Sequence, residues 1–162
     1  MFPEQLLILA RALLDEAREK RLRIATAESC TGGLIAGLLT DIAGSSDVFE
    51  RGFVTYSNAA KTELIGVPAA LIEEHGAVSE AVARAMAEGA LAHSLADLAV
   101  AVTGIAGPDG GTAEKPVGLV NIAAARKGGA LLHEEHRFGD ICRSNIRLKS
   151  VEAALKLLQR LF

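Results

Sequence analysis

The chain has 162 residues, half of them apolar and 23% charged, which is the composition of a folded globular domain. Its formal net charge of −3 offers no basic surface of the kind that binds nucleic-acid phosphates, and no apolar stretch is long enough to cross a membrane. We therefore expect a single domain over residues 1–162, with neither nucleic acid nor membrane as a partner.

Helices and strands are expected to alternate along the first two thirds of the chain. Apolar residues at helical spacing, or capping chemistry, predict helices over residues 2–20, 34–39 and 58–65, a short helix from 68, and a helix capped by Ser79 that reaches 93. Short runs bounded by turn residues predict strands over residues 22–27, 49–56, 97–103, 117–125 and 130–138. A final amphipathic helix carries an apolar stripe formed by Leu148, Val151, Leu155, Leu158 and Phe162.

This order predicts the α/β fold class, as a three-layer α/β/α sandwich around a mixed, mostly parallel central sheet. The run over 97–103 is almost continuously apolar, as expected for a strand buried on both faces. Ligands of such folds bind at the carboxyl ends of the strands, where loops lead into helices. Three segments in that position carry reactive or flexible residues.

The first segment, residues 27–33, runs from a strand into a helix. Ser29 can present its hydroxyl there beside backbone N–H groups of residues 30–33, which can stabilise an oxyanion or hold an anion. Cys30 is intrinsically more nucleophilic and is the main rival of Ser29. Helix capping by Ser29 or Thr31 is the alternative, and for a lone serine–glycine turn it is the more common case.

The second segment, residues 55–61, follows the next strand. Tyr56 is expected at the strand tip and Lys61 in the first turns of a helix. A nucleophilic serine needs a base, and a lysine kept neutral by burial can serve as one, with Tyr56 relaying the proton or orienting the amine. Lys61 as a solvated helix residue is the alternative. No His–Asp pair has the spacing of a known triad, so lysine is the leading base.

The third segment, residues 102–111, is rich in glycine but matches neither of the two common phosphate-binding glycine motifs. Thr103 is its natural ligand contact, and a flexible surface turn is the alternative. Arg143 and Arg147 lie four residues apart at the start of the last helix and share a face. Paired guanidiniums suit phosphate or carboxylate recognition, although a solvated, ion-paired face is the more common case.

Disulfide and metal chemistry are not expected. Cys30 and Cys142 have no partner at short spacing, and His133 and His136 lie three apart on an expected strand, so they point to opposite faces. The first residues also lack the basic start and apolar run of a signal peptide. A reducing cytoplasm is therefore the expected location.

Six runs of residues resemble the CinA C-terminal domain family, in the family's order and over nearly the whole chain. They are TAESCTGGLIA (26–36), IAGSS (42–46), FERGFVTYSNAAK (49–61), HGAVSE (75–80), VTGIAGPDGG (102–111) and KPVG (115–118). The resemblance implies nicotinamide-nucleotide amidohydrolase activity, in which nicotinamide mononucleotide and water give nicotinate mononucleotide and ammonia. It also implies an α/β/α fold, homodimers or larger homo-oligomers, and neither a metal nor an organic cofactor.

Carried over by position, the family's catalytic serine, tyrosine and lysine fall on Ser29, Tyr56 and Lys61. The substrate-binding residues expected with them are Cys30, Thr31, Gly32, Gly33, Ser46, Thr103, Gly104, Arg143 and Arg147. Family members often read Gly-Asp-Arg before the last helix, and this chain restores that spacing only if residues 141–142 are an insertion. Either Arg143 or Arg147 could therefore bind the substrate phosphate.

Three functions remain as hypotheses. The first is hydrolysis of the nicotinamide mononucleotide carboxamide by Ser29 with Lys61 as base. The second is a non-catalytic module that binds or senses pyridine nucleotides. The third is a Ser–Lys amidase with another amide substrate, because this chemistry does not itself select the substrate.

Overall fold

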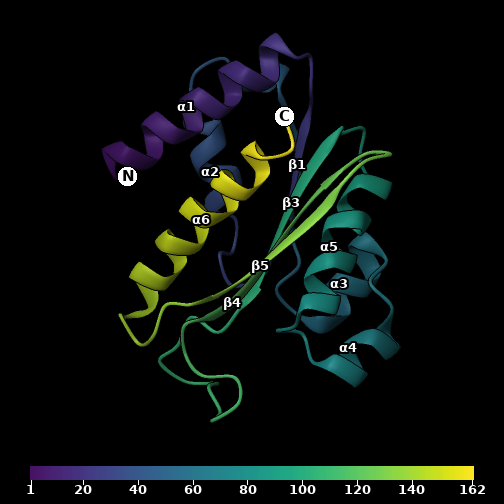
Figure 1. Cartoon of the computed structure of the whole chain (residues 1–162), viewed down its shortest axis with the longest axis vertical. Coiled ribbons are helices and arrows are strands. Elements are labelled where there is room, and N and C mark those ends of the chain that lie inside the picture. Colours follow the sequence, from purple (N-terminus) through teal and green to yellow (C-terminus); the bar gives the residue numbers. More distant parts are fainter.

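The computed structural model describes all residues, 1–162, as a five-stranded sheet with helices on both faces (Figure 1). The strands are β1 (Ile24–Glu28), β2 (Phe49–Val54), β3 (Leu98–Gly104), β4 (Leu119–Arg126) and β5 (Leu131–Arg137). The helices are α1 (Glu4–Glu19), α2 (Leu34–Thr40), α3 (Asn58–Ile65), α4 (Ala69–His75), α5 (Glu80–Ala92) and α6 (Arg143–Gln159), and a 3-10 turn, η1 (Ser45–Asp47), precedes β2.

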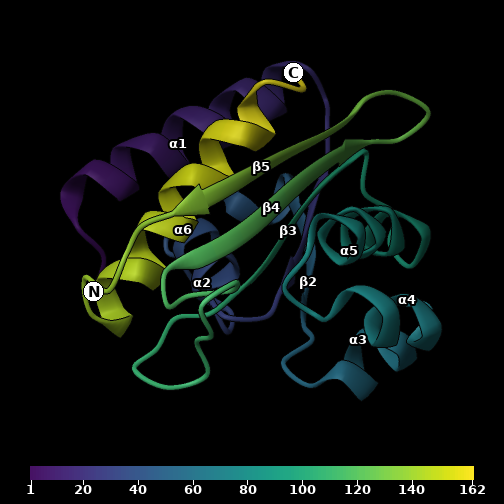
Figure 2. The same ribbon diagram turned by 60° about the horizontal axis from the view of Figure 1, so that its bottom comes forward.

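The helices form two layers, with α1, α2 and α6 on one face of the sheet and α3, α4 and α5 on the other (Figures 1 and 2). Each layer encloses its own apolar core, because alternate residues of the central strands point to opposite faces. Along β3, Val100 and Val102 belong to the core beneath α6, whereas Ala99 and Ala101 belong to the core beneath α5. The small alanines let α5 lie close to the sheet. The three-layer α/β/α prediction is confirmed.

The strand order is β2-β1-β3-β4-β5. Both neighbours of β1 run parallel to it, whereas the β3–β4 and β4–β5 pairs are antiparallel. Strand β4 is therefore the only one that runs against the other four. The sheet is mixed as expected, and it is mostly parallel in strand direction but evenly divided in its pairings.

The boundaries of β1 differ from the expected range of 22–27 by one to two residues. The N–H of Leu22 bonds the carbonyl of Ala17 and closes α1, with Arg21 at a φ of 57°, so the strand begins only at Ile24. At its other end, Glu28 is still paired with Val54. The Ser79 cap is confirmed, since its hydroxyl accepts the Val82 N–H at the start of α5.

The topology opens a crevice at the carboxyl ends of the parallel strands. The chain leaves β1 toward α2 on one face of the sheet and leaves β2 toward α3 on the other (Figure 2). The loops after neighbouring strands thus separate, and a ligand can enter between them. No helix combines the length and the apolar character that crossing a membrane requires.

Candidate active site

Ser29 and Lys61 meet at the carboxyl ends of β1 and β2. Ser29 directly follows β1, and Lys61 lies in the first turn and a half of α3, whose start is capped by the Ser57 hydroxyl on the Ala60 N–H. The Lys61 Nζ lies 3.0 Å from the Ser29 Oγ and 2.8 Å from the Thr55 carbonyl oxygen. The two residues are therefore in direct hydrogen-bond contact, the distance that proton transfer requires.

Lys61 is buried, with 1% of its surface exposed, and neither of its two hydrogen-bond partners is a carboxylate. Burial lowers the pKa of its ammonium below the ordinary value of 10.5. A neutral amine can donate an N–H to the Thr55 carbonyl while its lone pair faces the Ser29 hydroxyl. The solvated alternative for Lys61 does not hold, and the arrangement is that of a buried amine in hydrogen-bond contact with a serine hydroxyl.

Ser29 does not cap the helix that follows it. Helix α2 begins at Leu34, and neither Ser29 nor Thr31 bonds its free N–H groups by its side chain. Glu28 fills that role, because its carboxylate accepts the N–H groups of Gly33 and two residues of the first turn. The Ser29 hydroxyl is thereby left for Lys61.

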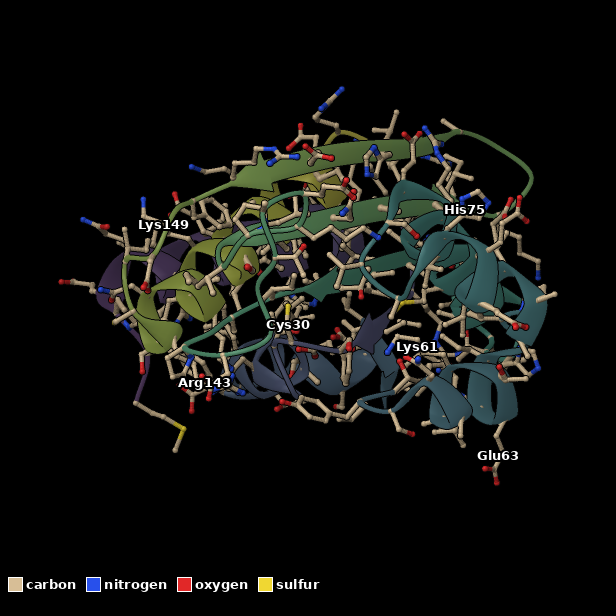
Figure 3. The ribbon with its side chains drawn as sticks, turned by 90° about the horizontal axis from the view of Figure 1, so that it is seen from below. Cys30, Lys61, Glu63, His75, Arg143 and Lys149 are labelled. Carbon is tan, nitrogen blue, oxygen red and sulfur yellow. The ribbon has the colours of Figure 1, made fainter.

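A cavity of about 270 Å³ lies over this pair. It is lined by residues from five segments of the chain: Ser29, Cys30, Tyr56, Asn58, Lys61, Ala77, Val78, Thr103, Gly104, Ile105, Ala106, Gly107, Asp109, Gly110 and Arg143. Viewed onto the carboxyl ends of the parallel strands, Cys30 lies between Arg143 on one side and Lys61 on the other (Figure 3). A larger cavity of about 480 Å³ lies between α1 and α6, but it contains neither Ser29 nor Lys61.

Cys30 lines the same cavity as Ser29 but is a poor nucleophile in this environment. Burial raises the pKa of its thiol to about 12, and the negative charge of Glu28 acts in the same direction. A thiol with such a pKa carries almost no thiolate at neutral pH, and the thiolate is the reactive form. No hydrogen bond joins its sulfur to Lys61, whose Nζ is directed to Ser29 and Thr55.

Tyr56 and Arg143 stand together at the rim of the cavity. Tyr56 is 60% exposed, and its hydroxyl accepts a hydrogen bond of 3.1 Å from the Arg143 guanidinium, which also donates to the Gly107 carbonyl at 2.8 Å. Tyr56 bonds neither Ser29 nor Lys61. The expected contact between the tyrosine and the lysine is absent, because the ring turns outward where the chain leaves β2.

Thr103 and Gly104 end β3 and line the cavity on the side opposite β2. Thr103 is buried and its hydroxyl donates to the Ala77 carbonyl at 2.8 Å, which ties β3 to the segment before α5. The carbonyl and Cα of the chain at 119–120 pack against Gly104, where a Cβ would lie 2.9 Å from the Leu119 oxygen. Both residues belong to the inner part of the cavity, away from its rim.

Five of the expected substrate-binding residues do not line the cavity: Thr31, Gly32, Gly33, Ser46 and Arg147. The first three lie in the turn behind Ser29, and Arg147 reaches that turn from α6. Ser46 lies in η1, just before the start of β2, and Phe49 there pairs with Ile24, the first residue of β1. Ser46 is therefore at the opposite end of the sheet from Ser29, and the chain does not bring it to this site.

Two lining residues, Ala77 and Val78, lie outside the three segments in which a ligand site was expected. Ala77 and Val78 reach the cavity because the Thr103 hydroxyl bonds the Ala77 carbonyl. The local sequence does not predict this contact, because it joins residues 26 positions apart. Asp109 is the only acidic residue of the lining, and it was included only as part of the glycine-rich run. Glu28 lies behind the site. The sequence could have indicated a role for it, because it is the only charged residue of β1.

Metal-binding residues do not gather in this structure. No group of three or more His, Cys, Asp or Glu side chains is close enough to hold a metal ion. His133 bonds Asn121 and approaches Glu80 of α5, whereas His136 bonds Glu134 and stacks on Phe138. The two histidines thus point to opposite faces of β5, as expected.

Curated proteins resemble this chain over most of its length. The relative named nicotinamide-nucleotide amidohydrolase PncC, from Enterobacter agglomerans, is 55% identical over 140 residues, which cover 86% of this chain and 84% of that protein. A CinA-like protein of Syntrophus aciditrophicus is 54% identical over 143 residues, which cover 88% of this chain but 34% of that protein. The chain spans about a third of the length (26–37%) of this and six other curated relatives.

The fold and the family are shared with solved structures. The crystal structure of the competence/damage inducible protein CihA from Agrobacterium tumefaciens superposes with a TM-score of 0.98 at 54% identity, covering 99% of this chain and 98% of that one. The model of the CinA C-terminal domain matches residues 7–162, which include Ser29, Lys61 and the whole cavity. On this match, this chain belongs to the CinA C-terminal domain family.

Proposed function

We propose that the chain hydrolyses the carboxamide of nicotinamide mononucleotide to nicotinate mononucleotide and ammonia, with Ser29 as nucleophile and Lys61 as base. The observation that carries this proposal is the buried contact of 3.0 Å between the Lys61 Nζ and the Ser29 Oγ on the floor of a cavity. The substrate is taken from the relative named nicotinamide-nucleotide amidohydrolase, which is similar over most of both chains.

The first step forms an acyl-enzyme. Neutral Lys61 accepts the proton of Ser29 directly, while the Ser29 Oγ bonds to the carboxamide carbon and the carbonyl oxygen becomes an oxyanion. Lys61, now an ammonium, gives its proton to the amide nitrogen as the carbon–nitrogen bond breaks, and ammonia leaves. Tyr56 is not required for this route, because no hydrogen bond places it between Ser29 and Lys61.

The second step restores the enzyme. Lys61, again neutral, accepts a proton from water, and the resulting hydroxide equivalent attacks the acyl carbon. The bond from that carbon to the Ser29 Oγ breaks, and Ser29 regains the proton from Lys61. Nicotinate mononucleotide is released as its carboxylate, its acid proton passes to solvent, and one water has been consumed for each ammonia formed.

The rim of the cavity carries hydrogen-bond donors that can bind the substrate phosphate. Arg143 presents a guanidinium there, and the N–H groups of Ala106, Gly107, Asp109 and Gly110 donate to no other protein group. A guanidinium beside free backbone N–H groups is the chemistry that binds a phosphate. We therefore assign the phosphate to Arg143 rather than to Arg147, whose guanidinium bonds the backbone of residues 30–31.

The resemblance also supports a cytoplasmic homodimer or larger homo-oligomer that needs neither a metal nor an organic cofactor. Size-exclusion chromatography with light scattering tests the oligomeric state. Dialysis against a metal chelator tests whether the reaction needs a metal ion, and we expect the activity to be unchanged after it.

The experiment is to incubate the purified chain with nicotinamide mononucleotide and to measure ammonia and nicotinate mononucleotide together. We expect both products in equal amounts, and slower release from nicotinamide riboside, which lacks the phosphate. Tight binding of the mononucleotide without release would favour the non-catalytic module. Faster release from an unrelated amide would favour an amidase of different specificity.

A further inference from the structure

The turn of residues 29–32, which carries Ser29, is held by hydrogen bonds from several parts of the chain. The Ser29 N–H donates to the Val102 carbonyl at 2.9 Å, and the Ser29 carbonyl accepts the Gly32 N–H at 3.0 Å. Two charged side chains, Arg147 and Glu28, also bond this turn or the residues just after it. Neither of these side chains lines the cavity.

Arg147 holds the turn from the side of α6. Its Nε donates to the Cys30 carbonyl at 3.1 Å and its Nη2 donates to the Thr31 carbonyl at 2.9 Å, across more than 110 residues of sequence. A planar guanidinium with two donors in fixed geometry suits two successive carbonyls, and a lysine could not reproduce this fork. No carboxylate pairs with Arg147, so its guanidinium interacts only with these two backbone carbonyls.

Gly32 makes room for this contact. A Cβ at residue 32 would lie 3.3 Å from the Arg147 Nη2, and the φ of 58° is one that other residues rarely adopt. The glycine therefore lets the guanidinium lie against the turn. This is a close approach to Arg147 rather than to a substrate.

Glu28 holds the opposite side of the turn. Its carboxylate is 1% exposed and accepts the N–H groups of Gly33 at 3.1 Å, Ile35 at 3.0 Å and Ala36 at 2.9 Å. These are orphan donors at the start of a helix, and a carboxylate satisfies them well. The acid that precedes Ser29 in sequence thus joins the end of β1 to the start of α2.

These bonds leave two N–H groups of the turn, those of Cys30 and Thr31, without a carbonyl or carboxylate acceptor, and only Cys30 lines the cavity. The Gly32 N–H is bonded to the Ser29 carbonyl and the Gly33 N–H to Glu28, so neither is available to an oxyanion. The Cys30 N–H has no carbonyl or carboxylate acceptor, and Cys30 lines the cavity. It belongs to the residue after the nucleophile, the position that supplies an oxyanion donor in other serine hydrolases.

We propose that Arg147 and Glu28 are positioning residues that hold the turn of Ser29 from its two sides. They keep the Ser29 Oγ on the Lys61 Nζ and leave the Cys30 N–H, whose only partner is its own thiol, available to the oxyanion, and neither touches the substrate. This inference rests on the proposed function for its kinetic consequence, but its structural part can be tested without any substrate.

The structural test uses Cys30 as a reporter of the turn. In a Cys142→Ser background Cys30 is the only thiol, and it is buried, so a maleimide should label it slowly. Arg147→Ala removes two charge-assisted hydrogen bonds and should speed labelling by about tenfold or more through local opening, with a cooperative thermal transition retained. Arg160→Ala, which removes an exposed arginine at the other end of α6, is the matched control and should leave the labelling rate unchanged.

The kinetic test separates positioning from substrate binding. Arg147→Ala and Glu28→Gln should each lower kcat about 100-fold through misplacement of the reacting groups, with KM changed only a few-fold. Arg147→Lys keeps the charge but not the fork, and its kcat should lie between those of the wild type and Arg147→Ala.

A higher KM with unchanged kcat and unchanged labelling in Arg147→Ala would overturn the proposal, because it would place Arg147 on the substrate. If Arg147→Ala does not fold, Arg147→Lys decides, and wild-type labelling together with wild-type kcat would overturn the proposal. If the wild type releases no ammonia from nicotinamide mononucleotide, the proposed function fails. The labelling rate of Cys30 still shows whether Arg147 holds the turn of Ser29.

Discussion

The floor of the cavity and its rim are built in different ways. On the floor, Ser29, Lys61 and Thr103 are buried and each is tied by hydrogen bonds to another strand or loop. At the rim, Tyr56, Arg143 and Asp109 are exposed, and Arg143 is held only by Tyr56 and one carbonyl. Bond-making chemistry needs fixed distances, whereas capture of a phosphate tolerates adjustment. Changes at the floor should therefore lower kcat, and changes at the rim should raise KM.

Apart from removal of the nucleophile itself, the largest effect is expected at Lys61. Lys61→Met keeps a long side chain in the buried site but removes the base, so kcat should fall by about 1,000-fold while the chain stays folded. Ammonia release and circular dichroism measure the two properties. Lys149→Met, on the exposed face of α6, is the matched control and should retain wild-type kcat. A wild-type rate in Lys61→Met would remove the base from the account.

The pH dependence should carry the same signature. Because burial lowers the pKa of Lys61, kcat/KM should rise with pH and level off below 10.5, as the amine becomes neutral. Between the lowered pKa and 10.5 the unfolded chain binds more protons than the folded one, so the free energy of unfolding should rise with pH across that window. Urea unfolding of the wild type and of Lys61→Met over this pH range tests the sign. The free energy of unfolding of the wild type minus that of Lys61→Met should rise with pH, and a fall of this difference would contradict the prediction.

A smaller effect, and on KM, is expected at Arg143. Arg143→Ala removes a charge-assisted contact to the phosphate, which should raise KM by about 10- to 100-fold and change kcat little. Higher ionic strength should weaken wild-type binding in the same direction. Arg137→Ala, an exposed arginine of β5, is the control. If Arg143→Ala loses the same factor in kcat/KM with nicotinamide riboside as with nicotinamide mononucleotide, Arg143 does not bind the phosphate.

The smallest effect is expected at Tyr56. Tyr56→Phe removes only the hydroxyl that bonds Arg143, so KM should rise by about threefold and kcat should be nearly unchanged. A loss of about 100-fold in kcat would instead show that Tyr56 moves a proton, and the distinction between floor and rim would then fail at this residue.

The fold could be predicted well because its signals are local. The expected ranges of α3 and α5 agree closely with the structure, α5 with the help of its Ser79 cap, and the buried run of residues 97–103 identified the central strand β3. The start of β1 was missed because Leu22 completes the end of α1 through a backbone bond that sequence periodicity does not reveal.

The site could be predicted in part. That Ser29 and Lys61 meet follows from a topological rule, since residues after neighbouring parallel strands share one edge of the sheet. The direction of a side chain does not follow from such a rule. Tyr56 turns outward, Arg147 turns to the backbone, and Ser46 lies at the other end of the sheet, each set by contacts distant in sequence.

The central claim is that Ser29, and not the adjacent Cys30, attacks the amide. Ammonia release from nicotinamide mononucleotide by Ser29→Ala and Cys30→Ala, measured side by side, tests it most directly. The account predicts that Ser29→Ala loses turnover by about 10⁴-fold or more, as for a removed serine nucleophile, and that Cys30→Ala remains active. Turnover retained in Ser29→Ala and lost in Cys30→Ala would contradict it and make the chain a cysteine hydrolase.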